Sequence, residues 1–389
     1  MGRSFILFLS NCYGEDGSAA LIAKEIKKAK PNVEVAGAPL LSKGEEYLKR
    51  GIPVITSSKV PPSGGFPLES LSGLVRDLIS GYAIPIKYYV GLKKVRNKID
   101  HIVVVGDVFL LVLGYLALRK RPIFLAIAKS DYIRPHSKME EFFMRHIPIW
   151  VLTHDELTAS ALRNKKIQAT FLGNPMVDDL SPTGIDFRIQ GKRAVGILPG
   201  SRYEAYNNFI KILPVADGVA HSFVSRSQMD ESVIFLCALA NNIKEDKIID
   251  LTRKLGWTYF EFNKFKGIRK GATQILFSHL FTDVIANSEC VIGLAGTANE
   301  QAAAIGKPIV SFVGTGPQTT KRRMKKQEKL LGGCLKFVSN YPDSVISEIL
   351  LLLGDKKLRE ERGQMGISRM GKSGGKEKIA KFLIEEFKL

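Results

Sequence analysis

Two short stretches of the sequence combine residue types that bind phosphate. The first reads "PGSR", residues 199–202, and follows an apolar run. Gly200 permits close backbone approach or unusual dihedral angles. Ser201 can cap a helix that we expect over 203–212, whose free N–H groups and dipole attract anions. Arg202 adds a forked donor suited to phosphate oxygens. The stretch predicts an anion site at a strand end; a capped helix with a surface arginine is the alternative.

The second stretch reads "GLAGTANEQ", residues 293–301. A strand is expected to end at its first glycine, with Gly296 and Thr297 forming a turn before the next helix. Backbone N–H groups at such a helix start again attract anions. Glu300 and Gln301 lie in the first helical turn. The carboxylate of Glu300 could accept hydrogen bonds from two ribose hydroxyls, or it could simply be favoured there by the helix dipole.

Three carboxylates are candidates for general-base catalysis. Asp107 follows the apolar run 102–105, and Glu15 and Asp16 lie in what we interpret as a Gly-rich turn after the first strand. A carboxylate at a strand end can remove the proton of an attacking hydroxyl. Asp107 is our first candidate. The alternative is that it only caps the helix expected over 108–118.

Parallel sheets covered on both faces are needed to position these residues. Apolar runs alternate with helix-like segments from end to end, and the runs are continuous instead of alternating with polar residues, which is typical of such sheets. We therefore predict an α/β chain of doubly wound sheets. The predicted strands are 5–10, 33–37, 101–106, 123–128, 149–153 and 169–173 in the first half, and 194–200, 233–240, 289–296, 308–314 and 335–339 in the second.

The polar interval 174–193, rich in Pro, Gly and Asp, interrupts this rhythm and predicts a linker. We therefore expect two Rossmann-like domains, 1–178 and 192–370, facing a cleft. The last helix, residues 375–389, can pack back on either half, the N-terminal domain included. In such folds ligands bind beyond the carboxyl ends of the strands.

The 389 residues carry a formal net charge of +19. This charge suits nucleic acid, an anionic membrane surface or a phosphorylated substrate, and it is also what a lysine-rich proteome would give. The sequence has no aromatic-basic RNA motif and no recognisable DNA-binding module. We therefore expect no nucleic-acid partner.

The four cysteines have no CxxC spacing, and no His/Asp/Glu cluster has metal-ligand spacing. We expect neither a disulfide framework nor a metal site. The apolar run 102–118 is interrupted by Gly106-Asp107 and predicts a strand, a turn and a packed helix instead of a bilayer span. The apolar run 5–9 is too short for a signal peptide. We expect a cytoplasmic protein.

Other segments favour an anionic membrane surface. Residues 71–82 have helical apolar spacing, and tyrosines and cations follow at 88–98. A second basic cluster, "KRRMKKQEK" at 321–329, adds attraction to anionic lipid. We therefore expect peripheral association with the inner face of the plasma membrane. The alternative is that 71–82 buries its apolar face on the sheet.

Several motifs together resemble one enzyme family. "FLGNPMVD" at 171–178, "ILPGSR" at 197–202 and "AGTANEQAAAIGKPIV" at 295–310 occur in the order seen in lipid-A-disaccharide synthases, and "GEDGSAALIAKEI" at 14–26 resembles that family's opening motif. The whole chain looks closer still to the lipid-A-disaccharide synthase-related proteins. The segments that carry this second likeness are "SGGFPLESLSGLVRDL" (63–78), "VVVGDVFLLVL" (103–113), "AKSDY" (128–132) and "GTGPQTT" (314–320).

The resemblance implies a GT-B fold whose C-terminal half holds a nucleotide-sugar donor. Carried over to this chain, Ser201, Arg202, Gly296 and Thr297 would contact the diphosphate, Glu300 would hold the ribose and Gln301 would assist. Asp107 falls near the catalytic aspartate of the synthases. On the acceptor side we expect Gly14, Lys129, Ser130 and Asp131. This half departs most from the synthases: one acidic position near Asp107 is missing or shifted, and "KSDYIRPHS" replaces their tryptophan-containing segment.

We therefore predict a glycosyltransferase that moves a sugar from a UDP-sugar to a lipid-linked hydroxyl, as lipid-A-disaccharide synthase does. Arg202 and two helix N-termini would stabilise the departing diphosphate, so that no cofactor or metal is needed. Three alternatives stay open: a nucleotide-sugar epimerase on the same fold, a non-catalytic nucleotide-sugar-binding protein, and a nucleic-acid-binding protein. The oligomeric state is open.

Overall fold

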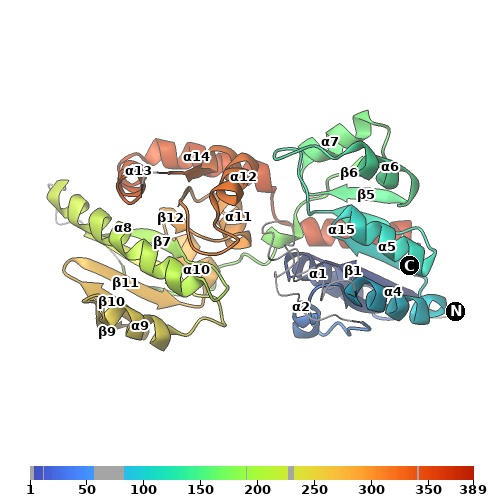
Figure 1. The fold of residues 1–389 in the computed structure, drawn as a ribbon, viewed down its shortest axis with the longest axis horizontal. Coiled ribbons are helices and arrows are strands. Elements are labelled where there is room, and N and C mark those ends of the chain that lie inside the picture. The colour runs from blue at the N-terminus through green and yellow to red at the C-terminus, as the bar shows by residue number, and fades with distance from the viewer. Residues whose placement is uncertain (1–3, 12, 57–82, 190, 227–231, 340) are drawn as a thin grey trace. The chain divides into compact units, whose positions relative to one another are not determined.

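The computed structural model describes residues 4–11, 13–56, 83–189, 191–226, 232–339 and 341–389 (Figure 1). The helix expected over 71–82 lies outside these residues. The chain forms two compact units. The N-terminal unit comprises residues 1–178 and 372–389, and the C-terminal unit comprises residues 179–371.

The N-terminal unit is built on a six-stranded parallel sheet with the order β2-β1-β3-β4-β5-β6. The strands are buried on both faces, as their continuous apolar sequences predict. They are β1 (Phe5–Ser10), β2 (Glu34–Pro39), β3 (His101–Val105), β4 (Ile123–Ala126), β5 (Trp150–Thr153) and β6 (Ala169–Thr170).

Two layers of helices cover this sheet (Figure 1). One face is covered by α1 (Tyr13–Ala29), α2 (Glu45–Lys49) and the C-terminal α15 (Gly375–Glu386). The other face is covered by α4 (Ala83–Val95), α5 (Val108–Leu118), α6 (Lys138–His146) and α7 (Glu156–Asn164). The run 102–118 forms β3, a turn and α5, as predicted. In the described part of the chain, no helix has the length and apolarity needed to cross a bilayer.

The C-terminal unit has an eight-stranded sheet with the order β14-β13-β12-β7-β8-β11-β10-β9. Six strands are parallel: β7 (Lys192–Leu198), β8 (Ser232–Ala238), β11 (Thr273–Ser278), β12 (Cys290–Gly293), β13 (Ile309–Ser311) and β14 (Leu335–Phe337). The helices are α8 (Ala205–Arg226), α9 (Glu245–Arg253), α10 (Phe281–Asn287), α11 (Thr297–Ala304), α12 (Lys321–Leu331), α13 (Asp343–Gly354) and α14 (Lys356–Met370).

The expectation of purely parallel sheets is wrong at one edge of this unit. β9 (Thr258–Phe262) and β10 (Phe265–Lys270) form an antiparallel hairpin that extends the sheet from β11. Their two-residue turn is Asn263-Lys264, and both residues have positive φ (49° and 73°). Such a turn usually carries glycine, and β9 lies largely exposed at the sheet edge, so its sequence is not continuously apolar.

Carboxylates anchor the connection between the units at both of its ends. At the N-terminal unit, Asp178 accepts hydrogen bonds of 2.5–3.1 Å from three successive N–H groups at the start of α15, residues 374–376. At the C-terminal unit, Asp283 accepts from the Thr183 hydroxyl (3.0 Å) and from the N–H groups of Gly184 and Ile185 (2.9 and 3.3 Å). Residues 179–182 lie between the two anchors.

Candidate functional site

The loop after β7 carries the first predicted phosphate stretch. Gly200 has φ of +104°, and a Cβ added there would lie 3.2 Å from the Leu294 carbonyl oxygen. The expected need for glycine is therefore confirmed. Ser201 is exposed, but α8 begins only at Ala205, so the prediction that Ser201 caps this helix is wrong. A turn lies between them, in which the Ala205 N–H donates to the Arg202 carbonyl (2.9 Å).

The loop after β12 is held in place by two buried amide side chains. Gly296 occupies the N-cap position of α11, where it has no side chain to bind the first N–H groups. Its carbonyl accepts a hydrogen bond from Gln327 Nε2 (2.8 Å), and Gln327 Oε1 accepts one from Asn299 Nδ2 (2.9 Å). Thr297, the first helical residue, is exposed. The start of α11 is thus fixed in place and open to an anion.

A third loop, which follows β13 and covers 312–320, packs beside the first. The Asn208 side chain joins them: its Nδ2 donates to the Pro199 carbonyl (3.1 Å), and its Oδ1 accepts from the Thr315 N–H (2.6 Å). Gly316 leaves no room for a Cβ, which would lie 2.6 Å from Glu204 Cγ. The sequence analysis missed Asn208 and the part played by this loop. A Gly- and Pro-containing segment directly after a strand was the available signal.

All predicted donor residues therefore gather at one edge of one sheet. The strands before the three loops, β7, β12 and β13, are neighbours, and their carboxyl ends lie at the same edge. Such an edge, with helix N-termini and a guanidinium, has the donor chemistry that binds a diphosphate. The predicted residues placed there are Gly200, Ser201, Arg202, Gly296, Thr297, Glu300 and Gln301, of which the last two are half-buried on α11.

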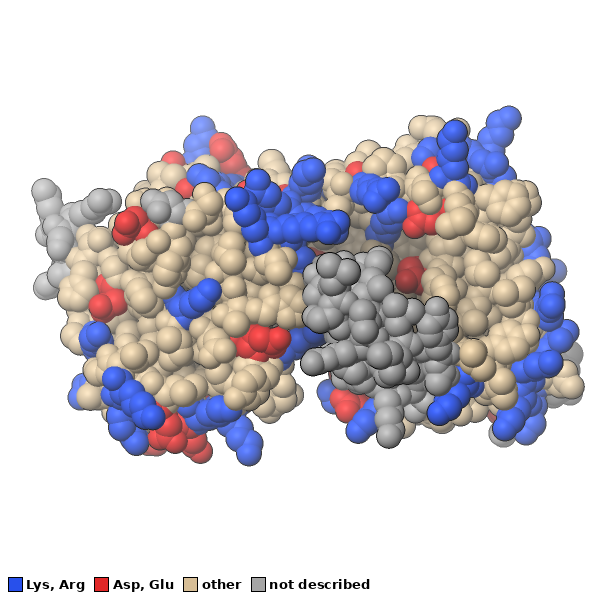
Figure 2. Space-filling view, viewed as in Figure 1, with Lys and Arg blue, Asp and Glu red and all other residues tan. Residues whose placement is uncertain are grey.

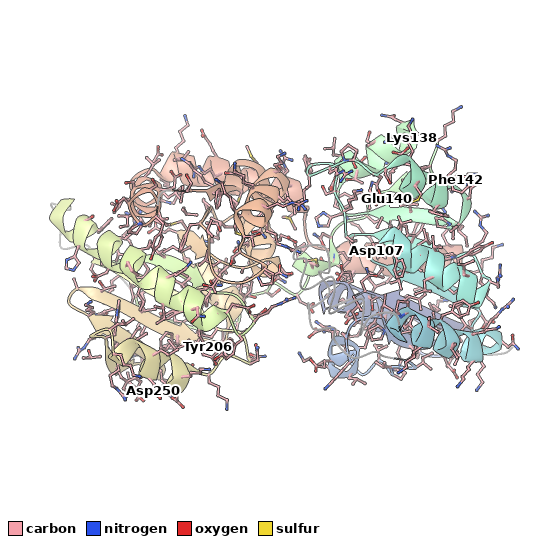
Figure 3. The ribbon with its side chains drawn as sticks, in the orientation of Figure 1. Asp107, Lys138, Glu140, Phe142, Tyr206 and Asp250 are labelled. Carbon is pink, nitrogen blue, oxygen red and sulfur yellow. The ribbon has the colours of Figure 1, made fainter. Side chains whose placement is uncertain are left out.

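Asp107 lies at the carboxyl end of β3 in the N-terminal unit (Figure 3). It caps α5, since its Oδ1 accepts a hydrogen bond from the Leu110 N–H (2.9 Å). The capping alternative is therefore confirmed. The side chain is half-buried, and within the described residues its second carboxylate oxygen makes no hydrogen bond. Asp107 keeps one oxygen for other chemistry.

The expected Gly-rich turn around Glu15 and Asp16 is wrong, because Gly14, Glu15 and Asp16 lie in the first turn of α1. Acidic side chains are favoured at that end of a helix by the dipole. Asp16 is buried, and its two oxygens accept hydrogen bonds from the hydroxyls of Ser10 and Ser42. Burial raises the pKa of the Asp16 carboxyl, although these hydroxyls act in the opposite direction. A carboxyl enclosed in this way is poorly placed to reach an acceptor.

Of the three predicted acceptor residues after β4, Lys129 and Ser130 have side chains that are bound to the protein itself. Lys129 pairs with Glu140 (2.7 Å), and the buried Ser130 hydroxyl accepts a hydrogen bond from the Tyr132 N–H (3.2 Å). The Asp131 carboxylate lies 3.5 Å from His136 Nδ1. Lys129 and Ser130 are thus bound within the protein, whereas the buried atoms Asp131 Oδ1 and His136 Nδ1 make no hydrogen bond within the described residues.

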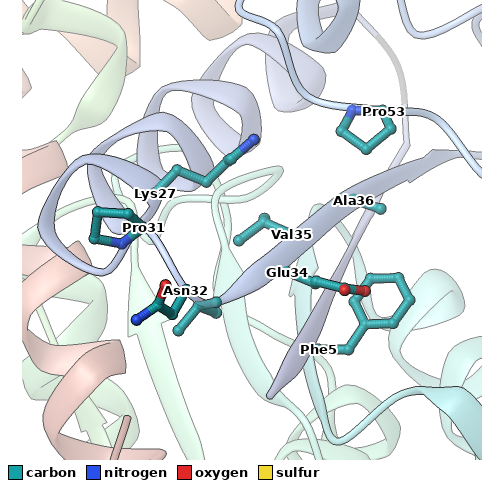
Figure 4. A pocket seen from close by; sticks show the side chains of 9 residues that line it. Phe5, Lys27, Pro31, Asn32, Glu34, Val35, Ala36 and Pro53 are labelled. Atoms are coloured by element: carbon teal, nitrogen blue, oxygen red, sulfur yellow. The ribbon is translucent and has the colours of Figure 1, made fainter. Parts of the chain in front are cut away.

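A surface hollow of about 310 Å³ lies elsewhere in the N-terminal unit (Figure 4). Its lining includes Phe5 and Glu34, the first residues of β1 and β2. It therefore opens at the amino ends of the strands, opposite the edge at which such sheets bind ligands. Among the described residues, no three His, Cys, Asp or Glu side chains are grouped to hold a metal ion. That the reaction needs no metal stays a prediction.

Comparison with known proteins identifies the fold. No family model matches the chain, and no curated protein matches its sequence. Solved structures do match over its whole length. The calicheamicin glycosyltransferase CalG4 is 12% identical, with 100% of this chain and 98% of that chain covered and a TM-score of 0.66. MurG from Acinetobacter baumannii is 13% identical, with 98% and 100% covered and a TM-score of 0.61.

The chain has the GT-B fold. A UDP-GlcNAc 2-epimerase from Neisseria meningitidis, solved with UDP-GlcNAc bound, is similar too: it is 15% identical, with 98% of this chain and 100% of that chain covered and a TM-score of 0.58. Transferases and epimerases thus share this fold. The predicted fold class of two Rossmann-like sheets is confirmed.

Proposed function

We propose that the protein is a glycosyltransferase that uses a UDP-sugar as donor. The observation that carries the proposal is the convergence of three loops around the exposed start of α11, with Arg202 on the first of them. The buried Gln327–Gly296 and Asn208–Thr315 contacts hold these loops before any ligand arrives. A preorganised set of N–H donors and a guanidinium stabilises the charge that gathers on a departing diphosphate.

In the proposed reaction, an acceptor hydroxyl oxygen bonds to the anomeric carbon of the sugar as the bond from that carbon to the diphosphate breaks. Asp107 takes the hydroxyl proton, through the carboxylate oxygen that does not cap α5. Glu300 binds the ribose hydroxyls, and Gln301 assists. We propose no metal or cofactor in this step.

We further propose that the acceptor is linked to lipid, as in lipid-A-disaccharide synthase. The order of the motifs at 171–178, 197–202 and 295–310 supports this part, as does the net charge of +19. Gly14, Lys129, Ser130 and Asp131 would then shape the acceptor side of the N-terminal unit. Their internal hydrogen bonds favour a scaffolding role for Lys129 and Ser130.

An epimerase that acts on the same donor is the second candidate, because a UDP-GlcNAc 2-epimerase is among the similar structures. The two activities differ in their need for an acceptor. Radiolabelled UDP-sugars incubated with the protein should give a labelled lipid only when membrane lipid extract is present. A changed sugar in the nucleotide pool without any acceptor would establish the epimerase instead.

The donor site is tested by calorimetry with UDP. We expect Arg202→Ala to weaken UDP binding about 10- to 100-fold, since a hydrogen bond to a charged group contributes about 1.5–3 kcal/mol. The matched control is Arg253→Ala, which removes an exposed arginine of α9 in the same unit. No binding of UDP to the unaltered chain, or equal binding by both variants, would remove the proposal.

A further inference from the structure

Helix α5 has the composition of a buried helix but lies in the outer layer of the N-terminal unit. Its sequence, "VFLLVLGYLAL", contains no charged residue. Leu110, Leu111 and Leu118 face the sheet and are buried. On the opposite side, Phe109 is 55% exposed and Leu116 is 43% exposed. A helix that is apolar all round normally has apolar surroundings on every side.

The two neighbouring helices continue this apolar surface. Helices α4 and α6 both contact α5 in the same layer. On α4, Ile86 is 62% exposed; on α6, Met139 is 68% and Phe142 is 54% exposed. Figure 3 shows Lys138 and Phe142 on the outer side of α6. We call the exposed side chains of Ile86, Val90, Phe109, Leu116, Met139 and Phe142 the α4–α6 face.

Cations, and few acids, surround the α4–α6 face. Neither α4 nor α5 contains Asp or Glu. The two acids of α6 are already paired, Glu140 with Lys129 and Glu141 with Lys165. Figure 2 shows a largely uncharged surface over α5, with Lys and Arg gathered at the edge of that surface. The exposed cations on or next to the three helices are Lys87, Lys93, Lys94, Arg96, Lys98, Arg119, Lys138 and Arg145.

We propose that the α4–α6 face seats the protein on an anionic lipid bilayer. Large apolar side chains on short helices enter the boundary between headgroups and acyl chains, and a cationic rim binds anionic headgroups. A second copy of the chain is a less suitable partner for the α4–α6 face, because two such faces in contact would bring their cationic rims together. A nucleic acid would leave the apolar centre without a partner. The proposal does not depend on the donor site.

The test uses the full chain and sedimentation with vesicles. We expect binding to vesicles of phosphatidylcholine with phosphatidylglycerol, little binding to phosphatidylcholine alone, and weakening as salt is raised. Met139→Ser with Phe142→Ser should lower the bound fraction at least tenfold. The control, Leu255→Ser with Leu351→Ser, changes two exposed apolar side chains of the C-terminal unit (46% and 47% exposed) and should bind as the unaltered chain does.

Urea unfolding of each variant shows that the chain is still folded, and it does so without relying on UDP binding, so that a failure of this proposal and a failure of the donor-site proposal can be told apart. Equal vesicle binding by the α4–α6 face variant and the control would overturn the proposal. The proposal would also be overturned if light scattering without lipid showed that the unaltered chain and the control are dimers while the α4–α6 face variant is a monomer.

Discussion

The edges at which the parallel strands of the two sheets end are built in opposite ways. In the C-terminal unit, buried side chains such as Asn208 and Gln327 bind loop backbone, and the start of α11 is exposed at the edge that also carries the half-buried Arg202. In the N-terminal unit, polar side chains bind one another: Asp16 with Ser10 and Ser42, and Lys129 with Glu140. The first edge is prepared for a ligand. In the second, Ser10, Ser42 and Lys129 are already used for structure, while one oxygen of Asp107 and the buried oxygens Asp131 Oδ1 and Asp155 Oδ2 make no hydrogen bond within the described residues.

Asp107→Asn is the most severe test of this contrast. An asparagine side chain can still accept the Leu110 hydrogen bond and cap α5, but it cannot take a proton. We expect transfer to fall about 100- to 10,000-fold with UDP affinity unchanged. Single-turnover rates and calorimetry measure the two quantities. Near-normal transfer would mean that the proton acceptor lies elsewhere.

Asp16→Ala should lower the stability of the protein and leave its activity nearly unchanged. The Ser10 and Ser42 hydroxyls would lose their buried acceptor, which costs about 1–3 kcal/mol of unfolding free energy. Urea unfolding measures this loss. Transfer per folded molecule and UDP affinity should stay near normal. A specific loss of transfer in a stably folded Asp16→Ala variant would restore Asp16 as a catalytic candidate.

Gln327→Ala should affect the donor edge more mildly. It removes the hydrogen bonds to the Gly296 carbonyl and to Asn299, so that the start of α11 is less well held. We expect UDP binding to weaken about tenfold, a cost of about 1.4 kcal/mol. Gln274→Ala, on β11 of the same unit, is the control, because its partner Lys192 lies at the amino end of β7. Equal UDP affinity for both variants would mean that UDP binding does not depend on the hydrogen bonds that Gln327 makes to the start of α11.

Glu140→Gln should change the free energy of unfolding only slightly, which is the smallest effect that we expect. Burial alone would raise the pKa of the Glu140 carboxyl, but hydrogen bonds from Lys129 and Ser137 outweigh it and lower the pKa to about 2. A lowered folded pKa adds stability above the unfolded value, and this is lost as pH falls toward 2. Because the Lys129–Glu140 pair is partly exposed and therefore screened by solvent, we expect a difference of about 0.5–1 kcal/mol at pH 7 that shrinks between pH 5 and pH 2. Urea unfolding at these pH values measures it, and a difference independent of pH would exclude the charge as its source.

The sequence predicts the parts of this molecule that depend on local pattern. Continuous apolar runs locate the buried parallel strands, and Asp107 after such a run locates the start of α5. Gly200 marks a backbone conformation that only glycine adopts readily. The β9–β10 hairpin is missed because its turn, Asn263-Lys264, lacks glycine and its first strand is largely exposed.

The features that the sequence did not predict depend on contacts between residues far apart in the chain. Asn208 and Thr315 are 107 positions apart, and no local spacing relates a polar residue of α8 to a loop after β13. In the same way, "GEDG" suggests a turn by composition, while the burial of Asp16 depends on Ser42 from another segment. The residues that could touch a ligand were therefore easier to predict than those that hold them.

Asp178, which binds the backbone N–H groups at the start of α15, brings together the two points at which the chain leaves and re-enters the N-terminal unit. The outgoing chain at 173–178 and the returning chain at 374–376 meet so closely that a Cβ on Gly375 would lie 2.8 Å from the Asn174 nitrogen. Topologically, everything between them is an insertion into the six-stranded domain. A single recombination event across these adjacent points could exchange the entire donor-binding half while leaving every strand connection of the other half intact.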